Sequence, residues 1–118
     1  MMALQHAKAG EIVDLRPLGP KLKDAKTSAI IKSKHFEAIR LIVLAGAHIP
    51  SHEIKNNITL HCLEGHVQLI LSSATIDLKA GEWAYLDPGE AHSIAGIEDS
   101  SLLMTILFPH RMGPMPGL

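Results

Sequence analysis

Two stretches of this sequence decide its fold: GAHIPSH at residues 46–52, closed downstream by Gly65, and GEWAYLDPGEAH at residues 81–92. Each stretch opens with a glycine and places a histidine, His52 or His92, at a strand edge or turn. Around them the chain consists of short runs of β-type residues, without the sustained 3.6-residue apolar period of a helix. The sequence therefore predicts an all-β domain with little helix, in which two distant imidazoles converge.

Eight runs have the composition of strands, and turn residues such as Gly, Ser, Pro and Asp separate them. They cover residues 29–32, 37–44, 57–63, 67–72, 74–78, 83–86, 92–95 and 102–108. Before them we expect one short strand over 12–15 and one helical turn over 21–26. So many short strands in one small domain favour a sandwich or barrel. We expect an N-terminal segment at 1–28, a β-barrel at 29–108 and a C-terminal tail at 109–118.

The charge, the cysteine content and the lengths of the apolar runs indicate in which compartment the protein works and which partners it lacks. The 118-residue chain has a formal net charge of -1 with both signs interspersed, so it presents no basic patch for nucleic acid or an anionic membrane. Its single cysteine, Cys62, cannot form an internal disulfide, which suits a reducing compartment. No signal segment opens the chain, and its apolar runs are far shorter than the roughly 20 residues that span a bilayer. We expect a cytoplasmic protein.

The two stretches resemble the paired motifs of the cupin superfamily, which are small double-stranded β-helix (jelly-roll) proteins. The first motif of that family combines a glycine, a His-x-His pair, a glutamate and a closing glycine. The second combines a glycine, Pro-x-Gly and a histidine. The residues of this chain that match are Gly46, His52, Gly65, Gly81, Gly89 and His92, with the proline one place late at Pro88. The resemblance covers residues 36–108 and implies a cupin-like jelly-roll barrel.

The chain departs from the family where metal would bind. Family members typically offer four side chains to iron, manganese, nickel or zinc. Here Ile54 replaces the second histidine of His-x-His, and Ile58 replaces the glutamate. An aliphatic side chain donates no lone pair, so the resemblance leaves only His52 and His92 as metal ligands. It implies a degenerate site that holds at most one divalent ion, and holds it weakly.

Two other histidines are candidates for a third ligand. Strand alternation places His48 on the same face as His52, provided that the chain bends near Pro50. Alternation also places His61 opposite Cys62, on the outer face of the strand, although a one-residue slip would turn it inward. Cys62 itself is expected in the apolar core with its strand neighbours.

Three further side chains are candidates for contacts with a ligand or with a partner subunit. Trp83 and Tyr85 share one strand face before the second motif, where they either line a ligand pocket or pack against the opposing sheet. Arg40 lies inside an apolar strand, and we expect it to pair with Glu37 or a partner subunit, or to bind an anionic ligand.

These features support three functional hypotheses. The first is a binding module for a small molecule, a weakly held divalent metal, or both, at His52 and His92. The second is a small metal-dependent dioxygenase or isomerase that takes a third ligand from His48 or His61. The third is a scaffolding protein, which would gain support if side chains filled the barrel. We also expect a homodimer, because a second copy can cover exposed sheet edges or apolar faces.

Overall fold

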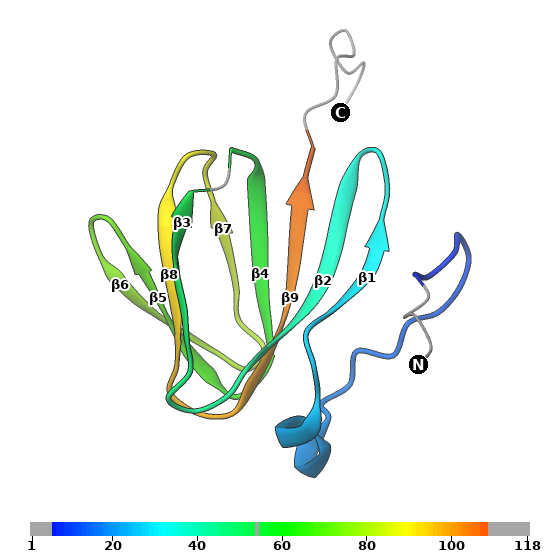
Figure 1. The fold of residues 1–118 in the computed structure, drawn as a ribbon, viewed down its shortest axis with the longest axis horizontal. Coiled ribbons are helices and arrows are strands. Elements are labelled where there is room, and N and C mark those ends of the chain that lie inside the picture. The colour runs from blue at the N-terminus through cyan, green and yellow to red at the C-terminus, as the bar shows by residue number, and fades with distance from the viewer. Residues whose placement is uncertain (1–5, 54, 109–118) are drawn as a thin grey trace, which may run out of the picture.

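In the computed structural model, which describes residues 6–53 and 55–108, one short 3-10 helix is followed by nine strands (Figure 1). The elements in chain order are η1 (Gly19–Asp24), β1 (Ser28–Lys32), β2 (Phe36–Val43), β3 (His48–Glu53), β4 (Asn57–Glu64), β5 (His66–Leu71), β6 (Thr75–Lys79), β7 (Trp83–Leu86), β8 (Ala91–Gly96) and β9 (Ser100–Leu107). Within the described part of the chain, no helix has the length and apolar character of a membrane span.

The strands form two antiparallel sheets. The five-stranded sheet has the order β1-β2-β9-β4-β7, and the four-stranded sheet has the order β3-β8-β5-β6. The chain crosses repeatedly from one sheet to the other, so β9 lies between β2 and β4 although all three are distant in sequence. This arrangement confirms the predicted all-β jelly roll.

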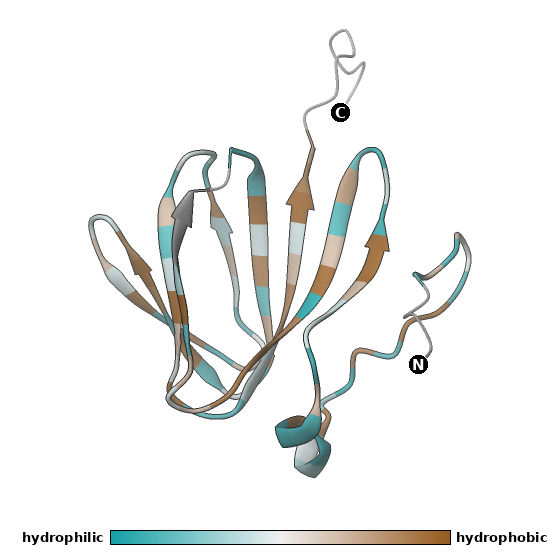
Figure 2. Cartoon of the chain, viewed as in Figure 1, coloured by the Kyte–Doolittle hydropathy of each residue, from teal (hydrophilic) through white to brown (hydrophobic). Residues whose placement is uncertain are grey.

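The core lies between the two sheets and is built from alternating strand positions. In β4, Ile58, Leu60 and Cys62 are buried, while the residues between them are only partly buried. Figure 2 shows the same alternation as apolar and polar bands along β4 and β2. The buried cluster consists of Val43, Ile58, Leu60, Cys62, Val67, Leu69, Leu78, Leu86, Ile94, Leu102 and Met104. Aliphatic side chains therefore fill the barrel, and the predicted core position of Cys62 is confirmed.

Two predictions near the barrel rim are wrong. Residues 12–15 form no strand, since no neighbouring strand pairs with them, and Ile12 is 97% exposed. Conversely, residues 48–53 form the strand β3, which the predicted strand ranges leave out. Proline lacks a backbone N–H but is tolerated at a sheet edge, and β3 is the edge strand of its sheet. The predicted helical turn is present as η1, whereas the expected tail at 109–118 lies outside the described residues.

Arg40 and Glu64 attach the N-terminal segment to the barrel. Glu64 accepts the backbone N–H groups of Leu18 at 3.0 Å and Gly19 at 3.1 Å, and Arg40 donates to the carbonyl of Arg16 at 2.9 Å. The guanidinium and the carboxylate also pair with each other at 3.3 Å. The segment that precedes β1 therefore follows the outside of the barrel without joining its sheets.

The expected pairing of Arg40 with Glu37 does not occur. The two residues lie three positions apart on β2, so strand alternation turns their side chains to opposite faces of the sheet. Glu64 meets Arg40 instead, because β9 brings β2 and β4 to either side of itself and Ser101 bridges the two side chains.

Candidate functional site

His52 and His92 stand directly opposite each other on β3 and β8. The two strands are antiparallel neighbours at one edge of the four-stranded sheet. Directly opposed residues in such a pair have Cα atoms about 4.5–5.5 Å apart. The tertiary fold thus joins the histidines of the two sequence motifs at adjacent backbone positions, as the sequence predicts.

A bulge in β3 creates this alignment. Ile49 pairs with Ile94 and His52 pairs with His92, so two residues of β3 lie opposite the single residue between Ile94 and His92. The extra residue falls at Pro50 or its neighbour, where the missing N–H of proline removes one ladder bond in any case. The bulge interrupts the simple alternation that grouped His48 with His52.

His48 therefore does not face the barrel interior. It pairs with Ala95, whose neighbour Ile94 is in the core, so His48 and Ala95 belong to the outer face of the sheet. His48 is exposed, as expected for that face. The structure does not support His48 as a third ligand beside His92.

His61 is also turned away from the interior. It pairs with Leu103 on one side and Trp83 on the other, and its strand neighbours Leu60 and Cys62 are buried inward. His61 faces outward, as predicted. The strand is not shifted by the one residue that would turn His61 inward toward a metal. Among the described side chains, which leave out residues 51–54, no group of three or more His, Cys, Asp or Glu is placed to hold a metal.

His92 is buried, and its Nδ1 makes a polar contact with the backbone. The side chain is 1% exposed, between the backbone positions of His52 and Leu71 on the two flanking strands. Its Nδ1 lies 3.3 Å from the carbonyl oxygen of Glu90. A carbonyl only accepts, so Nδ1 is the donor in this contact. Metal-ligating histidines are commonly oriented by such a bond from the other ring nitrogen.

Trp83 and Tyr85 point away from the barrel interior, so a ligand that contacts them would lie on the outer face of the sheet. The two side chains are 60% and 48% exposed on the outer face of β7, while Ala84 and Leu86 turn inward. The Tyr85 hydroxyl donates to Asn57 Oδ1 at 3.0 Å. The alternative expectation, packing against the opposing sheet, fails for the same reason of strand parity.

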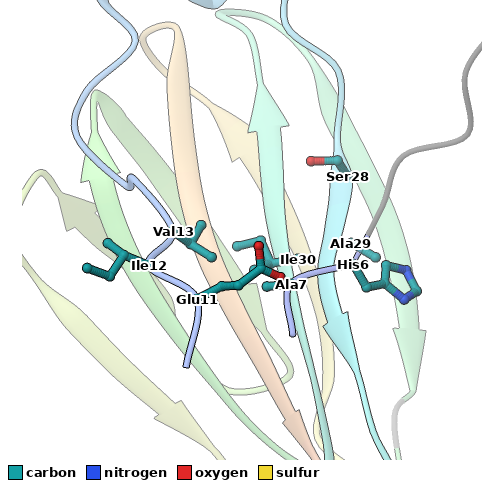
Figure 3. Close-up of a pocket in the computed structure, with 8 residues that line it drawn as sticks. All are labelled: His6, Ala7, Glu11, Ile12, Val13, Ser28, Ala29 and Ile30. Atoms are coloured by element: carbon teal, nitrogen blue, oxygen red, sulfur yellow. The ribbon is translucent and has the colours of Figure 1, made fainter. Parts of the chain in front are cut away.

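The cavities of the molecule lie at its surface. One of about 370 Å³, open to solvent, lies between the N-terminal segment, with Glu11, Ile12 and Val13, and the edge strand β1 (Figure 3). None of its lining residues belongs to β3 or β8. A smaller one of about 130 Å³ is lined by residues that include Lys55 and Pro88. Its other lining residues are Asn56, Asn57, Leu107 and Phe108, at the start of β4 and the end of β9, and His92 is not among them.

Comparison of sequences gives limited information. No protein-family model matches the chain. A curated relative, an uncharacterized protein of Aquifex aeolicus (strain VF5), is 26% identical over 73 residues. The match spans 62% of this chain and 60% of that protein, less than two thirds of either length.

Solved structures are more informative about the fold. A conserved protein of unknown function from Streptococcus pyogenes has a TM-score of 0.74 at 14% identity, covering 93% of this chain and 97% of its own. A cupin superfamily protein from Desulfitobacterium hafniense DCB-2 has a TM-score of 0.71 at 18% identity, covering 87% and 100%. A cupin 2 conserved barrel domain protein from Salinispora arenicola CNS-205 has a TM-score of 0.65 at 17% identity, covering 83% and 91%. The resemblance read from the two sequence motifs is thus confirmed at the level of architecture, and the chain is a small cupin-fold protein.

Proposed function

We propose that this protein is a binding module whose site is the His52 and His92 pair at the mouth of the barrel. The ligand we assign to the pair is one divalent transition-metal ion, such as zinc or nickel, held weakly. The observation that carries the proposal is the register of β3 and β8, which sets the two histidines directly opposite each other.

The donor chemistry suits such an ion. Imidazole nitrogens bind zinc, copper, iron and nickel. Directly opposed positions on antiparallel strands have Cβ atoms about 4.5–5.5 Å apart, which allows two imidazoles to approach a common ion at the usual metal–nitrogen distance of about 2.0–2.1 Å.

The same residues do not fit a tightly held catalytic metal. Ile58, at the position of the family's glutamate, is packed in the core. A non-haem iron oxygenase site uses two histidines and a carboxylate, and no such carboxylate joins His92 among the described residues. Water or donors from a small molecule must therefore complete the coordination. The lack of a third protein ligand among the described side chains favours the binding module over the dioxygenase or isomerase.

One observation favours a second candidate, the scaffolding protein. The space between the sheets is filled by aliphatic side chains, and His92 is 1% exposed. A protein that needs no interior ligand would have this kind of core. Metal binding separates the two candidates, because a pure scaffold needs neither histidine.

The test is a calorimetric titration of chelator-stripped full-length protein with zinc or nickel chloride. We expect His52→Ala and His92→Ala to weaken binding by at least about tenfold, which is 1.4 kcal/mol. His48→Ala and His61→Ala are matched controls, since both histidines lie on outer faces, and we expect them to bind as the wild type does. Circular dichroism checks folding, and His52→Ala carries the test if the buried His92 is needed for stability.

Two results would contradict the proposal. Equal affinities in all four variants would place binding on other histidines. A wild-type protein that takes up neither metal would leave the scaffold as the better description.

A further inference from the structure

We infer that residues 16–26 form a strap that opens from the barrel as one unit, and that the ionised carboxylate of Glu64 keeps it closed. The strap contains η1 and ends just before Thr27, whose hydroxyl accepts the backbone N–H of Ile42 on β2. Figure 1 shows η1 below β1 and β2, at the lower end of the view. The strap contains neither His52 nor His92, so the inference is independent of the proposed metal site.

The strap has few apolar contacts to hold it on the barrel. The structure describes every one of its residues, and only Leu22 is buried, at 4% exposure. The helix η1 is a six-residue 3-10 helix without a side-chain cap at its N-terminus. A 3-10 helix of this length has poor hydrogen-bond geometry and little stability of its own. Segments with few buried apolar contacts open at a lower free energy than the core does.

The backbone at Leu18 and Gly19 is shaped to hold an anion. Leu18 has φ of -80° and ψ of -20°, and Gly19 has a left-handed φ of +58°. Successive residues of this right-handed and left-handed kind turn their N–H groups into one concave nest that binds anions. The Glu64 carboxylate occupies the nest, at 3.0 Å from the nitrogen of Leu18 and 3.1 Å from that of Gly19. The strap is therefore fastened chiefly by one charged group.

Arg40 makes this fastening depend on the charge of Glu64. Its guanidinium donates to the carbonyl of Arg16 at 2.9 Å and lies 3.3 Å from the carboxylate, and Arg40 is only 8% exposed. If Glu64 takes up a proton, a buried guanidinium is left without its counter-charge, which is strongly unfavourable. Opening the strap returns the guanidinium to water. Protonation of one carboxylate thus weakens the nest and favours the open state at the same time.

The other groups around Glu64 do not titrate in the same pH range. Asp14, just before the strap, is hydrogen-bonded to Arg16, which lowers the pKa of Asp14 to about 2. On β4, burial raises the pKa of Cys62, so its thiol stays neutral in acid. From β9 the facing group is the hydroxyl of Ser101, which donates to the carboxylate. Glu64 is therefore the group that controls the strap in acid.

The pH at which the strap opens follows from the environment of Glu64. Burial raises the pKa of this carboxylate, but its hydrogen bonds and the charge of Arg40 outweigh burial and hold the pKa below its ordinary value. In the open state the carboxylate returns to an ordinary glutamate pKa of about 4.3. The strap is therefore fully fastened above that pH and loosens as the pH falls through the lower pKa of the closed form.

Hydrogen exchange measured by NMR tests whether the strap opens as a unit. The amides of Lys21 and Ala25 bond to carbonyls within the strap, and no printed bond joins them to Glu64. We expect Glu64→Gln to lower the protection of both amides, and of Leu18 and Gly19, by the same factor of at least about ten, because a charged acceptor is lost. The amides of β4, which is paired on both sides, should keep their protection.

Matched variants separate the fastening from a general loss of a carboxylate or a glycine. Asp77→Asn removes a carboxylate from the other sheet and should leave the strap amides unchanged. Gly19→Ala disfavours the left-handed backbone of the nest, while open space surrounds the added Cβ. We expect it to lower the protection of the strap at least about fivefold. Gly10→Ala introduces similar strain at φ +87°, also in open space but ahead of the strap, and should have no effect there.

The pH dependence gives a second readout. In the wild type, the protection of the strap amides should fall below the ordinary glutamate range, at a higher pH than the protection of β4 does. In Glu64→Gln, the strap should be loose at every pH, since this side chain takes up no proton.

Three outcomes would overturn the inference. In the first, the strap amides of the wild type exchange no faster than those of β4, so that the strap opens only when the whole domain unfolds. In the second, Glu64→Gln loosens Leu18 and Gly19 but leaves Lys21 and Ala25 unchanged, so that the carboxylate protects only the two N–H groups it contacts. In the third, Asp77→Asn loosens the strap as much as Glu64→Gln does.

Discussion

Arg40 and Glu64 form an ion pair that is largely withdrawn from water, with Nη2 3.3 Å from Oε2 and side chains only 10% and 12% exposed. The carboxylate also accepts the Ser101 hydroxyl at 2.6 Å and the N–H groups of Leu18 and Gly19. One glutamate thus satisfies donors from β2, β9 and the N-terminal segment. This cluster closes the outer face of the sheet at the end where η1 begins.

We expect Glu64→Ala to lower the free energy of unfolding by about 3 kcal/mol, because it leaves the buried guanidinium of Arg40 without its counter-charge. Urea denaturation followed by circular dichroism measures the change. Asp14→Ala is the control, since Asp14 pairs with Arg16 at 2.8 Å on the exposed surface and should matter little. If the two substitutions lowered the free energy of unfolding equally, the buried Arg40–Glu64 pair would stabilise the fold no more than an exposed pair does.

The same carboxylate should make stability depend on pH. Burial by itself raises the pKa of Glu64, but hydrogen bonds from Leu18, Ser101 and Gly19 and the charge of Arg40 outweigh it and hold the pKa below its ordinary range. A lowered folded-state pKa stabilises the fold fully above the unfolded value of about 4.3, and this contribution is lost as the pH falls through the folded-state pKa.

Urea midpoints measured from neutral pH down to acid test this effect. The wild type should lose stability below the ordinary glutamate range. Glu64→Gln should show a smaller loss over the same interval, since it has no proton to take up. The exposed Asp77, whose pKa is also lowered by its bond to His66, remains in both proteins and serves as a common background. Identical pH profiles of the two proteins would show that Glu64 does not cause the loss of stability at acid pH.

Gly65 should be the least replaceable glycine of the two motifs. Its φ of +88° lies in the left-handed region, and a Cβ there would overlap the Asp99 carbonyl and Ser100. Gly89 has a similar φ of +82° but open space around the added atom. We expect Gly89→Ala to cost about 1–2 kcal/mol from backbone strain alone, and Gly65→Ala to cost more than about 3 kcal/mol. Thermal or urea unfolding compares them, and similar costs would contradict the clash at Gly65.

Cys62 should be chemically inert while the protein is folded. Its side chain is fully buried in the core, and this burial raises the pKa of the thiol, so little thiolate is present at neutral pH. A thiol reagent such as DTNB should react slowly with native protein and release one equivalent per chain at once in denaturant. Immediate reaction under native conditions would show that the core opens readily.

The strands that were predicted well are those whose alternation is uninterrupted. β7 matches its predicted bounds of 83–86, and β4 shows the predicted burial of Ile58, Leu60 and Cys62. The errors arise where a local signal and the tertiary context disagree. Residues 12–15 have strand-like composition but no neighbouring strand, whereas β3 contains Pro50 and forms because an edge position tolerates it.

In the candidate site, too, some features could be predicted from the sequence and others depend on how the strands pair. The positions of His52 and His92 were identified from motif spacing, but the bulge that separates His48 from them follows from the pairing of β3 with β8. Likewise, the sequence shows that Trp83 and Tyr85 share a strand face. Only the order of strands in the sheet shows that this face points outward.

By itself the sequence determined an all-β domain of many short strands, because strand alternation and turn residues are local properties that can be read residue by residue, and the resemblance of its two motifs to those of the cupin superfamily added the jelly-roll architecture. The tertiary structure alone decided which distant residues meet: His52 with His92, and Arg40 with Glu64 rather than Glu37. Those partners depend on strand register and bulges, and a shift of one residue reverses the face of every side chain in a strand. No local pattern records that shift.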